Sequence, residues 1–150
     1  MRRYLAAFGP ASRRDIVQWS MMHVPEIGRA LDRLEPLRRF RDEHGRELLD
    51  VARAPLPDGE APAPVRFLPK WDNVLLAFAD RTRVLPEQYR KKVIRMNGDV
   101  AQTFLVDGFV AGLWRLESGR VLLEPFGRLS RAQRGQVDDE AARLEAFLAD

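Results

Sequence analysis

A proline-rich stretch, "APLPDGEAPAP" at residues 54–64, limits most strongly how this chain can fold. It holds four prolines in eleven residues. Proline lacks a backbone N–H and fixes φ, so the stretch cannot form an ordinary helix or a central strand. We therefore predict a linker at 54–64 between a first unit, residues 1–53, and a second unit, residues 65–150.

Composition indicates a globular protein and excludes several classes. The chain has 150 residues, of which 45% are hydrophobic, and it contains no cysteine. Disulfide frameworks, thiolate zinc fingers and thiol nucleophiles are thus excluded. No apolar run reaches the length of a bilayer span, and the N-terminus lacks a signal-peptide core. We expect a soluble, cytoplasmic protein.

Charge is weakly basic overall but uneven along the chain. Basic residues outnumber acidic ones 25 to 22, and all but three of them (Lys70, Lys91 and Lys92) are arginines. Arginine suits phosphate recognition, although a GC-rich genome also favours Arg codons over Lys codons. Residues 81–95 contain six basic side chains and one acidic one, whereas residues 130–150 are net negative.

The first unit has the pattern of three short helices. Residues 2–8 form an apolar-sided segment that Gly9-Pro10 ends, and Ser12 with Asp15 resembles a capping box for the next helix. After a turn at 20–25, Pro25 suits the first turn of a third helix. Its apolar stripe is Ile27, Leu31 and Leu34, and Pro36 should end it.

A charged β-hairpin is predicted to follow at residues 37–51. A three-residue turn at 43–45, with Gly45 left-handed, sets the register. That register pairs Asp42 with Arg46, Arg41 with Glu47, Phe40 with Leu48, and Arg38 with Asp50. Three pairs are opposite charges and one is apolar, as cross-strand neighbours prefer. A two-residue turn would instead place Asp42 opposite Glu47.

Three short helices and a charged hairpin are the order of a winged helix-turn-helix, with the third helix as recognition helix and the hairpin as wing. Together with "FLPKWDNVLLAFADRTRVLP" and "TFLVDGFVAGLWR", this unit resembles the winged helix DNA-binding-domain family that contains the AlkZ-like DNA glycosylases. The resemblance covers nearly the whole chain. It implies a fragment: the last winged helix of a longer protein and a small β-rich C-terminal domain.

The resemblance also bears on catalysis. The family's glycosylases use a Gln-x-Gln pair on an N-terminal winged helix, and this chain has only Gln133-Arg134-Gly135-Gln136, with different spacing. In "SMMH" at 20–23, relatives tend to have a glycine after the serine. Because the Gln-x-Gln pair is missing, we expect no catalytic residue in this chain.

The second unit is predicted to be a β-meander with flanking helices, which makes the fold class α+β. Residues 65–68 form a short strand, and Pro86 opens a basic helix at 86–95 that Asn97-Gly98 closes. Hairpins turn at Asp107-Gly108 and at Ser118-Gly119, where Glu117 pairs with Arg120. Ser130 caps a last helix with one apolar face, formed by Val137, Ala141, Leu144 and Leu148.

Asp72 and Asp80 are the residues whose role decides between enzyme and scaffold. As a pair of carboxylates they would suit acid–base chemistry or metal binding. The structural interpretation makes Asp72 an N-cap and Asp80 a partner of Arg81 or Arg83, buried near Trp71. We favour the structural interpretation because ordinary local interactions explain both positions.

Other reactive constellations are missing from the sequence. His23 and His44 have no second ligand at metal spacing, and no Gly-x-Ser-x-Gly elbow or phosphate loop occurs. We expect neither a metal nor a cofactor.

Arginines and lysines are the candidate DNA contacts. Arg29 and Arg33 would lie on the recognition helix, but Glu26 and Asp32 lie nearby, and the wing bases face carboxylates. A self-neutralised surface binds phosphate weakly, so the basic residues of 81–95 form the better patch. The candidates are Arg81, Arg83, Arg90, Lys91, Lys92, Arg95, Arg29, Arg33 and Arg41.

The function predicted from these observations is a non-catalytic, DNA-associated winged-helix protein whose partner is double-stranded DNA. One alternative is a fragment or subunit of a DNA repair glycosylase that acts with a separate N-terminal chain. The other is a protein-contact module, a homodimer or a partner of a chain that covers the surface of the missing domains.

Overall fold

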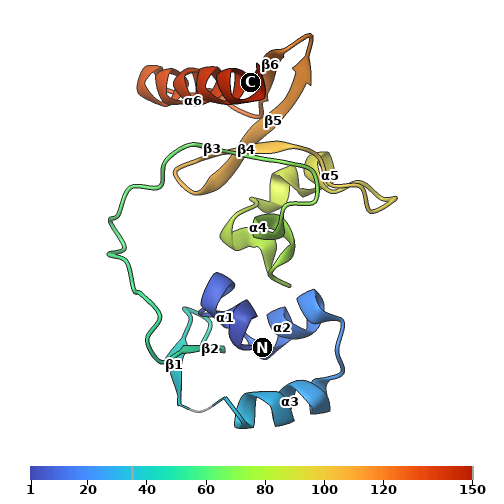
Figure 1. Ribbon diagram of the computed structural model, residues 1–150, viewed down its shortest axis with the longest axis vertical. Helices are drawn as coiled ribbons and strands as arrows, with labels where there is room; N and C mark the ends of the chain where they lie inside the picture. The colour runs from blue at the N-terminus through green and yellow to red at the C-terminus, as the bar shows by residue number, and fades with distance from the viewer. Residues whose placement is uncertain (35, 150) are drawn as a thin grey trace. The chain divides into compact units, whose positions relative to one another are not determined.

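The computed structural model describes residues 1–34 and 36–149. Its contacts group into two compact units: Met1–Gly59 with Leu76–Asp80, and Glu60–Leu75 with Arg81–Asp150 (Figure 1). Helices and antiparallel sheets occur together, so the class is α+β. The predicted division of the chain at a linker of residues 54–64 stays a prediction. The segment Leu76–Asp80 falls in the predicted second unit, 65–150, but groups with the first. The last residue of that predicted unit, Asp150, lies outside the described residues.

Three helices begin the first unit: α1 (Arg2–Phe8), α2 (Arg13–Ser20) and α3 (Val24–Asp32). The predicted capping box is confirmed, because the Asp15 N–H donates to Ser12 Oγ at 3.2 Å and the Ser12 N–H donates to Asp15 Oδ2 at 2.8 Å. Met21 is left-handed at φ 57° and ends α2. Helix α3 ends at Asp32, before Pro36, so Leu34 packs on the core from beyond the helix end.

The hairpin has the predicted register. Strands β1 (Leu37–Arg41) and β2 (Glu47–Val51) place Phe40 opposite Leu48 and Arg41 opposite Glu47. Gly45 is left-handed at φ 75°. The predicted Asp42–Arg46 pair is confirmed. The predicted Arg41–Glu47 ion pair is wrong: Glu47 pairs with Arg39 at 2.7 Å, while Arg41 donates to the Gly45 carbonyl at 3.0 Å. Arginines of β1 therefore reach diagonal or backbone acceptors.

The core of the first unit includes a residue far along the chain. Its buried side chains are Tyr4, Leu5, Ala11, Ile16, Ile27, Leu31, Leu49 and Ala77. The segment Leu76–Asp80 supplies Ala77 and also Phe78, whose ring meets Phe8 edge-on at a centroid distance of 6.4 Å. Removal of these apolar surfaces from water drives the packing.

The second unit is built on one antiparallel sheet. Its strands are β3 (Arg66–Leu68), β4 (Thr103–Val106), β5 (Phe109–Glu117) and β6 (Arg120–Pro125), in the order β3-β4-β5-β6. Both predicted turns are confirmed, with positive φ at residues 107, 108, 118 and 119, and Glu117 faces Arg120. Because β3 pairs with β4, the sheet has four strands rather than the three of the predicted meander.

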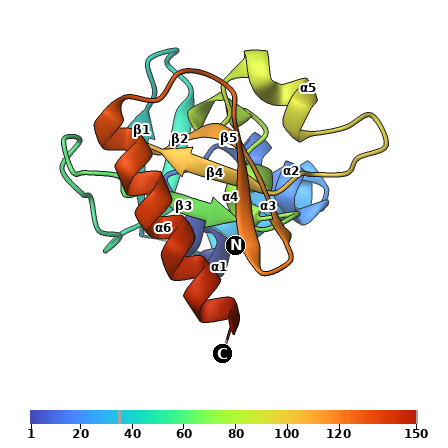
Figure 2. The same ribbon diagram turned by 90° about the horizontal axis from the view of Figure 1, so that it is seen from above.

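Helix α6 (Arg131–Ala149) lies across this sheet (Figure 2). Val137 is buried with Val65, Phe104 and Val106. The predicted cap is confirmed, since the Gln133 N–H donates to Ser130 Oγ at 3.1 Å. The predicted apolar face fades toward the end of the helix, where Leu148 is 49% exposed.

The predicted basic helix at 86–95 is shorter than expected. Two short helices lie in this range, η2 (Glu87–Tyr89) and α5 (Arg90–Val93), and a third, η1 (Arg81–Arg83), precedes it. Helix α5 ends at Val93 because Ile94 adopts an extended conformation and bridges to Val100. Gly98, at φ 81°, belongs to the turn between those two residues and does not cap the helix.

Asp72 provides a test of the cap at α4 (Asn73–Leu76). Its Oδ1 accepts the Val74 N–H at 2.8 Å, as an N-cap does. Replacing Asp72 by Ala should lower the free energy of unfolding by about 1 kcal/mol. Replacement by Asn, which caps equally well, should change it little. Urea denaturation of both variants measures the difference, and equal losses would show that the charge, not the cap, matters.

Candidate nucleic-acid interface

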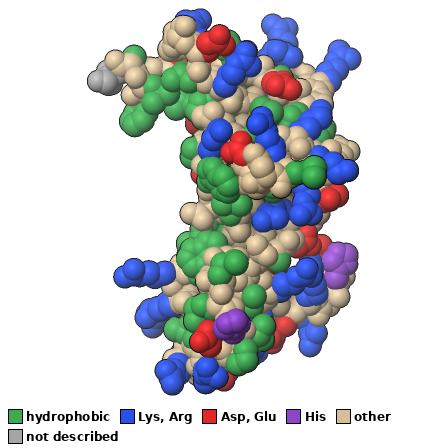
Figure 3. Space-filling view, turned by 90° about the vertical axis from the view of Figure 1, so that its right-hand side faces the viewer, with side chains coloured by type: hydrophobic (Ala, Val, Ile, Leu, Met, Phe, Trp, Pro, Cys, Tyr) green, Lys and Arg blue, Asp and Glu red, His purple; other side chains and the backbone are tan. Residues whose placement is uncertain are grey.

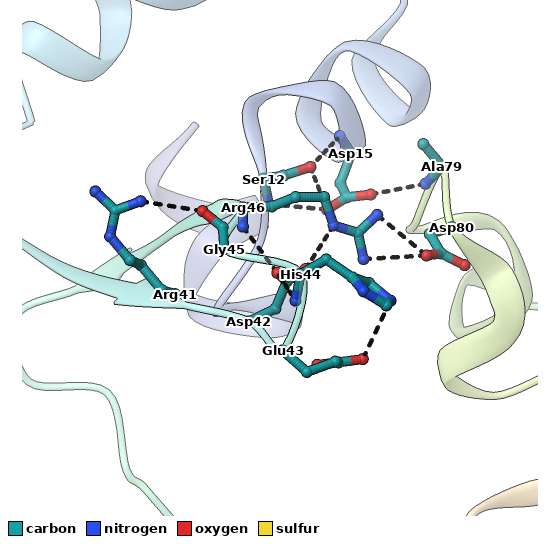
Figure 4. Close-up of polar contacts among 10 residues, drawn as sticks. All are labelled: Ser12, Asp15, Arg41, Asp42, Glu43, His44, Gly45, Arg46, Ala79 and Asp80. Atoms are coloured by element: carbon teal, nitrogen blue, oxygen red, sulfur yellow. Dashed lines mark hydrogen bonds and ion pairs between the residues drawn. The ribbon is translucent and has the colours of Figure 1, made fainter.

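A polar network surrounds the turn of the first-unit hairpin (Figure 4). The Arg46 guanidinium contacts the carboxylate of Asp42 and, at 3.1 and 3.2 Å, that of Asp80. Asp15, besides capping α2, accepts the Ala79 N–H at 2.8 Å. These contacts hold the segment Leu76–Asp80 to the hairpin and to α2.

Both aspartates singled out from the sequence have structural partners. Asp72 caps α4, and Asp80 binds Arg46, a partner 34 residues away that the sequence pattern did not indicate. The expected burial of Asp80 near Trp71 is wrong, because the Asp80 side chain is 34% exposed and Trp71 is 53% exposed. The two carboxylates also belong to different compact units.

The network shifts two pKa values in opposite directions. Desolvation opposes the charged form of Asp42, but hydrogen bonds from Arg46 and from the His44 N–H outweigh it, so the pKa of Asp42 is lowered. Hydrogen bonds to Asp42 and then to Asp80 raise the pKa of Arg46. Arg46 is thus neutralised twice, which weakens its attraction for a phosphate.

The charged surface of α3 is balanced. Arg29 and Arg33, the predicted recognition-helix contacts, are exposed together with Glu26 and Asp32. Arg33 also lines a hollow of about 560 Å³ with Arg2 and Arg53. The sequence pattern gave no sign of these last two arginines, because α1 and the residues after β2 are brought together only by the fold.

In the second unit, α5 presents three consecutive basic side chains. Arg90, Lys91 and Lys92 are exposed, and Arg90 lies 3.8 Å from Glu87. Lys92 lies over the Phe126 ring, 5.0 Å from its centroid. The part of the chain that the structure describes places no carboxylate in ion-pair contact with Lys91 or Lys92.

The other basic candidates of this unit are more constrained. Burial, and then the charge of Arg90, lower the pKa of Arg81, whose Nε donates to the Leu75 carbonyl at 3.0 Å. Arg95 lies 3.8 Å from Asp99, which is also 3.5 Å from Lys70. Arg83 is exposed. On the face drawn in Figure 3, Lys and Arg side chains are interspersed with acidic and hydrophobic ones.

Neither a metal-binding cluster nor a membrane-spanning helix occurs in the described part of the chain. Within residues 1–34 and 36–149, no group of three or more His, Cys, Asp or Glu side chains is arranged to hold a metal ion. Over the same residues, no helix is both long enough and apolar enough to cross a membrane.

Comparisons with known proteins agree on a family. The model of the family described as "DNA glycosylase AlkZ-like" matches residues 1–147. Among solved structures, the Streptomyces sahachiroi DNA glycosylase AlkZ matches with a TM-score of 0.76 and 24% sequence identity. The match covers 94% of this chain but 40% of that one, so this chain spans less than half of the relative's length. No curated sequence matches. The resemblance inferred from the sequence is confirmed.

The network around Arg46 predicts a pH-dependent contribution to stability. Asp42 has a folded-state pKa below its ordinary value of 3.8, so its charged form stabilises the fold. That contribution should be complete above pH 3.8 and should disappear as the pH falls through the folded-state value. Asp42→Asn should therefore be less stable than the parent at neutral pH and converge with it in acid.

Glu43→Gln is the matched control, since it removes the same charge from the same turn. Its carboxylate has a 3.8 Å contact to His44 but none to Arg46. Urea denaturation from neutral to acid pH compares the three proteins. Equal losses in the two variants at every pH would show that Asp42 has no special interaction.

Proposed function

This chain belongs to the AlkZ-like DNA glycosylase family, and we propose that it binds double-stranded DNA without catalysing base removal. The observation that supports this most is the exposed basic run Arg90, Lys91 and Lys92 on α5. Cations that neutralise phosphates supply most of the sequence-independent affinity for DNA. We name the basic residues of 81–95 the α5 patch.

We further propose that the first unit is a winged helix-turn-helix that connects by a linker, residues 54–64, to a β-rich C-terminal domain. The order α1-α2-α3-β1-β2 and the left-handed turn at Met21 support this assignment. In this proposal β1 and β2 are the wing and α3 takes the position of a recognition helix.

Compensation of charge favours the α5 patch over the winged helix as the main DNA contact. Helix α3 and its C-cap residue Arg33 expose two acids and two bases, and Glu26 also accepts the His23 N–H at 3.3 Å. In the wing, Arg39 pairs with Glu47 and Arg46 with two aspartates. Phosphates would have to displace these carboxylates, whereas Lys91 and Lys92 require no such displacement.

A second candidate function is that of a glycosylase part that acts with a separate chain. The coverage of 40% of the AlkZ structure favours it. The Gln-x-Gln pair that the family uses would then come from the other chain. Gln133, the nearest candidate here, is committed to the cap of α6, since its Oε1 accepts the Ser130 N–H at 3.0 Å.

A protein-contact role is supported by four exposed apolar residues of the first unit. Trp19, Met21, Met22 and Val24 lie within six residues and are each between 37% and 82% exposed. Exposed apolar groups so close together mark interaction sites. This role becomes the preferred one if no DNA binding is measured.

The absence of catalysis can be tested directly. This chain alone should not release alkylated bases, because the sequence holds no Gln-x-Gln pair and no other residue pair is assigned to activate water. Alkylated duplex DNA is incubated with the protein and then treated with heat or alkali. Strand scission above a control without protein would contradict the prediction.

Charge reversal on α5 tests the binding surface. Lys91→Glu with Lys92→Glu should weaken binding to every duplex sequence, because phosphate contacts carry no sequence information. The slope of log affinity against log salt should fall by roughly 0.9 for each phosphate that the variant no longer neutralises. Fluorescence anisotropy at several salt concentrations measures both quantities.

Arg41→Glu is the comparison variant, since it reverses one charge in the wing. Arg41 donates to the Gly45 carbonyl, so its loss should affect stability more than affinity. The opposite ranking would move the DNA surface to the winged helix. If neither the parent protein nor either variant binds duplex DNA at low salt, the proposed function is overturned.

A further inference from the structure

A hollow of about 220 Å³ lies beside the sheet of the second unit. Two aromatic side chains, Tyr89 and Phe109, line it, together with Gly127, Arg128, Leu129 and Gln133 and with apolar residues of β4 and β5. Its walls are therefore mostly apolar and aromatic, with one cation, Arg128. We name it the aromatic hollow.

Phe109 is held at the edge of this hollow although half of its surface is exposed. It follows the two-residue turn Asp107-Gly108, in which both residues have positive φ, and it faces Val106 across that turn. Phe109 is 50% exposed, and the exposed half of its ring gains none of the free energy that burial of apolar surface provides. An exposed aromatic ring on a rigid turn is a suitable stacking surface.

The turn is fixed to the N-terminus of α6 by Gln133. The Gln133 amide donates to Asp107 Oδ2 at 3.1 Å, and its Oε1 accepts the Ser130 N–H at 3.0 Å. Both ends of the amide are thus used inside the protein. These two hydrogen bonds fix the orientation of the Gln133 side chain at the wall of the hollow.

The aromatic hollow is continuous with the α5 patch. Tyr89 directly precedes Arg90, and its ring packs against the Phe126 ring with a centroid distance of 4.6 Å and a tilt of 38° between the ring planes. Lys92 lies over the other ring of this pair. Phe126 in turn precedes Gly127 and Arg128, which line the hollow. Cations and aromatic rings alternate along this surface, the combination that binds unpaired nucleotides.

We propose that the aromatic hollow takes one unstacked base of a DNA strand whose phosphates lie on the α5 patch. The inference rests on the proposed function, since it assumes that the patch binds DNA. Every base has a π face that can stack on Phe109 or Tyr89, and Arg128 suits a flanking phosphate. The protein should therefore prefer DNA with an unpaired nucleotide, without preferring a particular base.

The experiment compares a paired duplex with the same duplex carrying one bulged nucleotide. The bulged duplex is made in four versions, one for each base at the bulge. Fluorescence anisotropy measures the affinity of the parent chain for all of them. The parent should bind the bulged duplexes at least about fivefold more tightly, as expected when one base stacks on an aromatic side chain. The four bulged bases should differ little.

Two variants of Phe109 locate the effect. Phe109→Ala should abolish the preference for the bulge and leave affinity for the paired duplex unchanged. Phe109→Leu, which keeps apolar contact but removes the ring, should give the same result. Phe147→Ala is the matched control, because Phe147 is another exposed phenylalanine of the second unit, 76% exposed, and does not line the hollow. It should keep the preference.

The outcomes separate this inference from the proposed function. DNA binding with equal affinity for paired and bulged duplexes overturns the inference and leaves the proposed function in place. A preference that both Phe109 variants retain also overturns it. No binding to any duplex at low salt overturns both.

Discussion

The Tyr4 hydroxyl donates a 2.6 Å hydrogen bond to the Ala77 carbonyl, 73 positions along the chain. This contact joins the segment Leu76–Asp80 to the first unit. Both partners are buried, so loss of the Tyr4 hydroxyl would leave the Ala77 carbonyl buried without this hydrogen bond. The Ala79 N–H and the Asp80 carboxylate bind Asp15 and Arg46 in the same way. Residues of α1, α2 and the hairpin therefore satisfy polar groups of Leu76–Asp80.

The same contacts determine which cations are available to a ligand. Arg46 is exposed and lies on a turn, where a sequence-based argument would place a phosphate contact, yet its guanidinium is occupied by Asp42 and Asp80. Arg81 is tied to a backbone carbonyl and partly buried. Net charge per segment therefore overstates the attraction of the wing and of the start of the α5 patch. The difference between basic composition and available charge is a property of the tertiary structure.

What could be predicted from the sequence is what local interactions determine. The Ser12 and Ser130 caps, the register of the first hairpin and the turns at 107–108 and 118–119 depend on residues a few positions apart, and each is confirmed. The Arg46–Asp80 pair and the Tyr4–Ala77 bond join residues from different segments, and no periodicity indicates them. The predicted basic helix at 86–95 is too long, because helix propensity does not indicate that Ile94 bridges to Val100. No sequence pattern indicates the aromatic hollow, because its residues come from separate segments of the chain.

The position of Phe109 shows how a local irregularity determines what a surface can bind. Phe104 faces Gly112 and Leu105 faces Val110, so Ala111 is an extra residue on β5 and forms a bulge. Without it the register would shift by one, and the side chains of β5 beyond the turn would exchange faces. The bulge leaves two residues for the turn, which Asp107-Gly108 can provide, and places Phe109 on the same face as Val106. Gly112 is required beside the bulge, because a Cβ there would lie 2.4 Å from the Phe104 ring and 2.5 Å from the Glu124 carbonyl. The burial of Phe104 and the exposure of Phe109 thus follow from the same register. A substitution at Gly112 would therefore disturb the aromatic hollow although Gly112 does not line it.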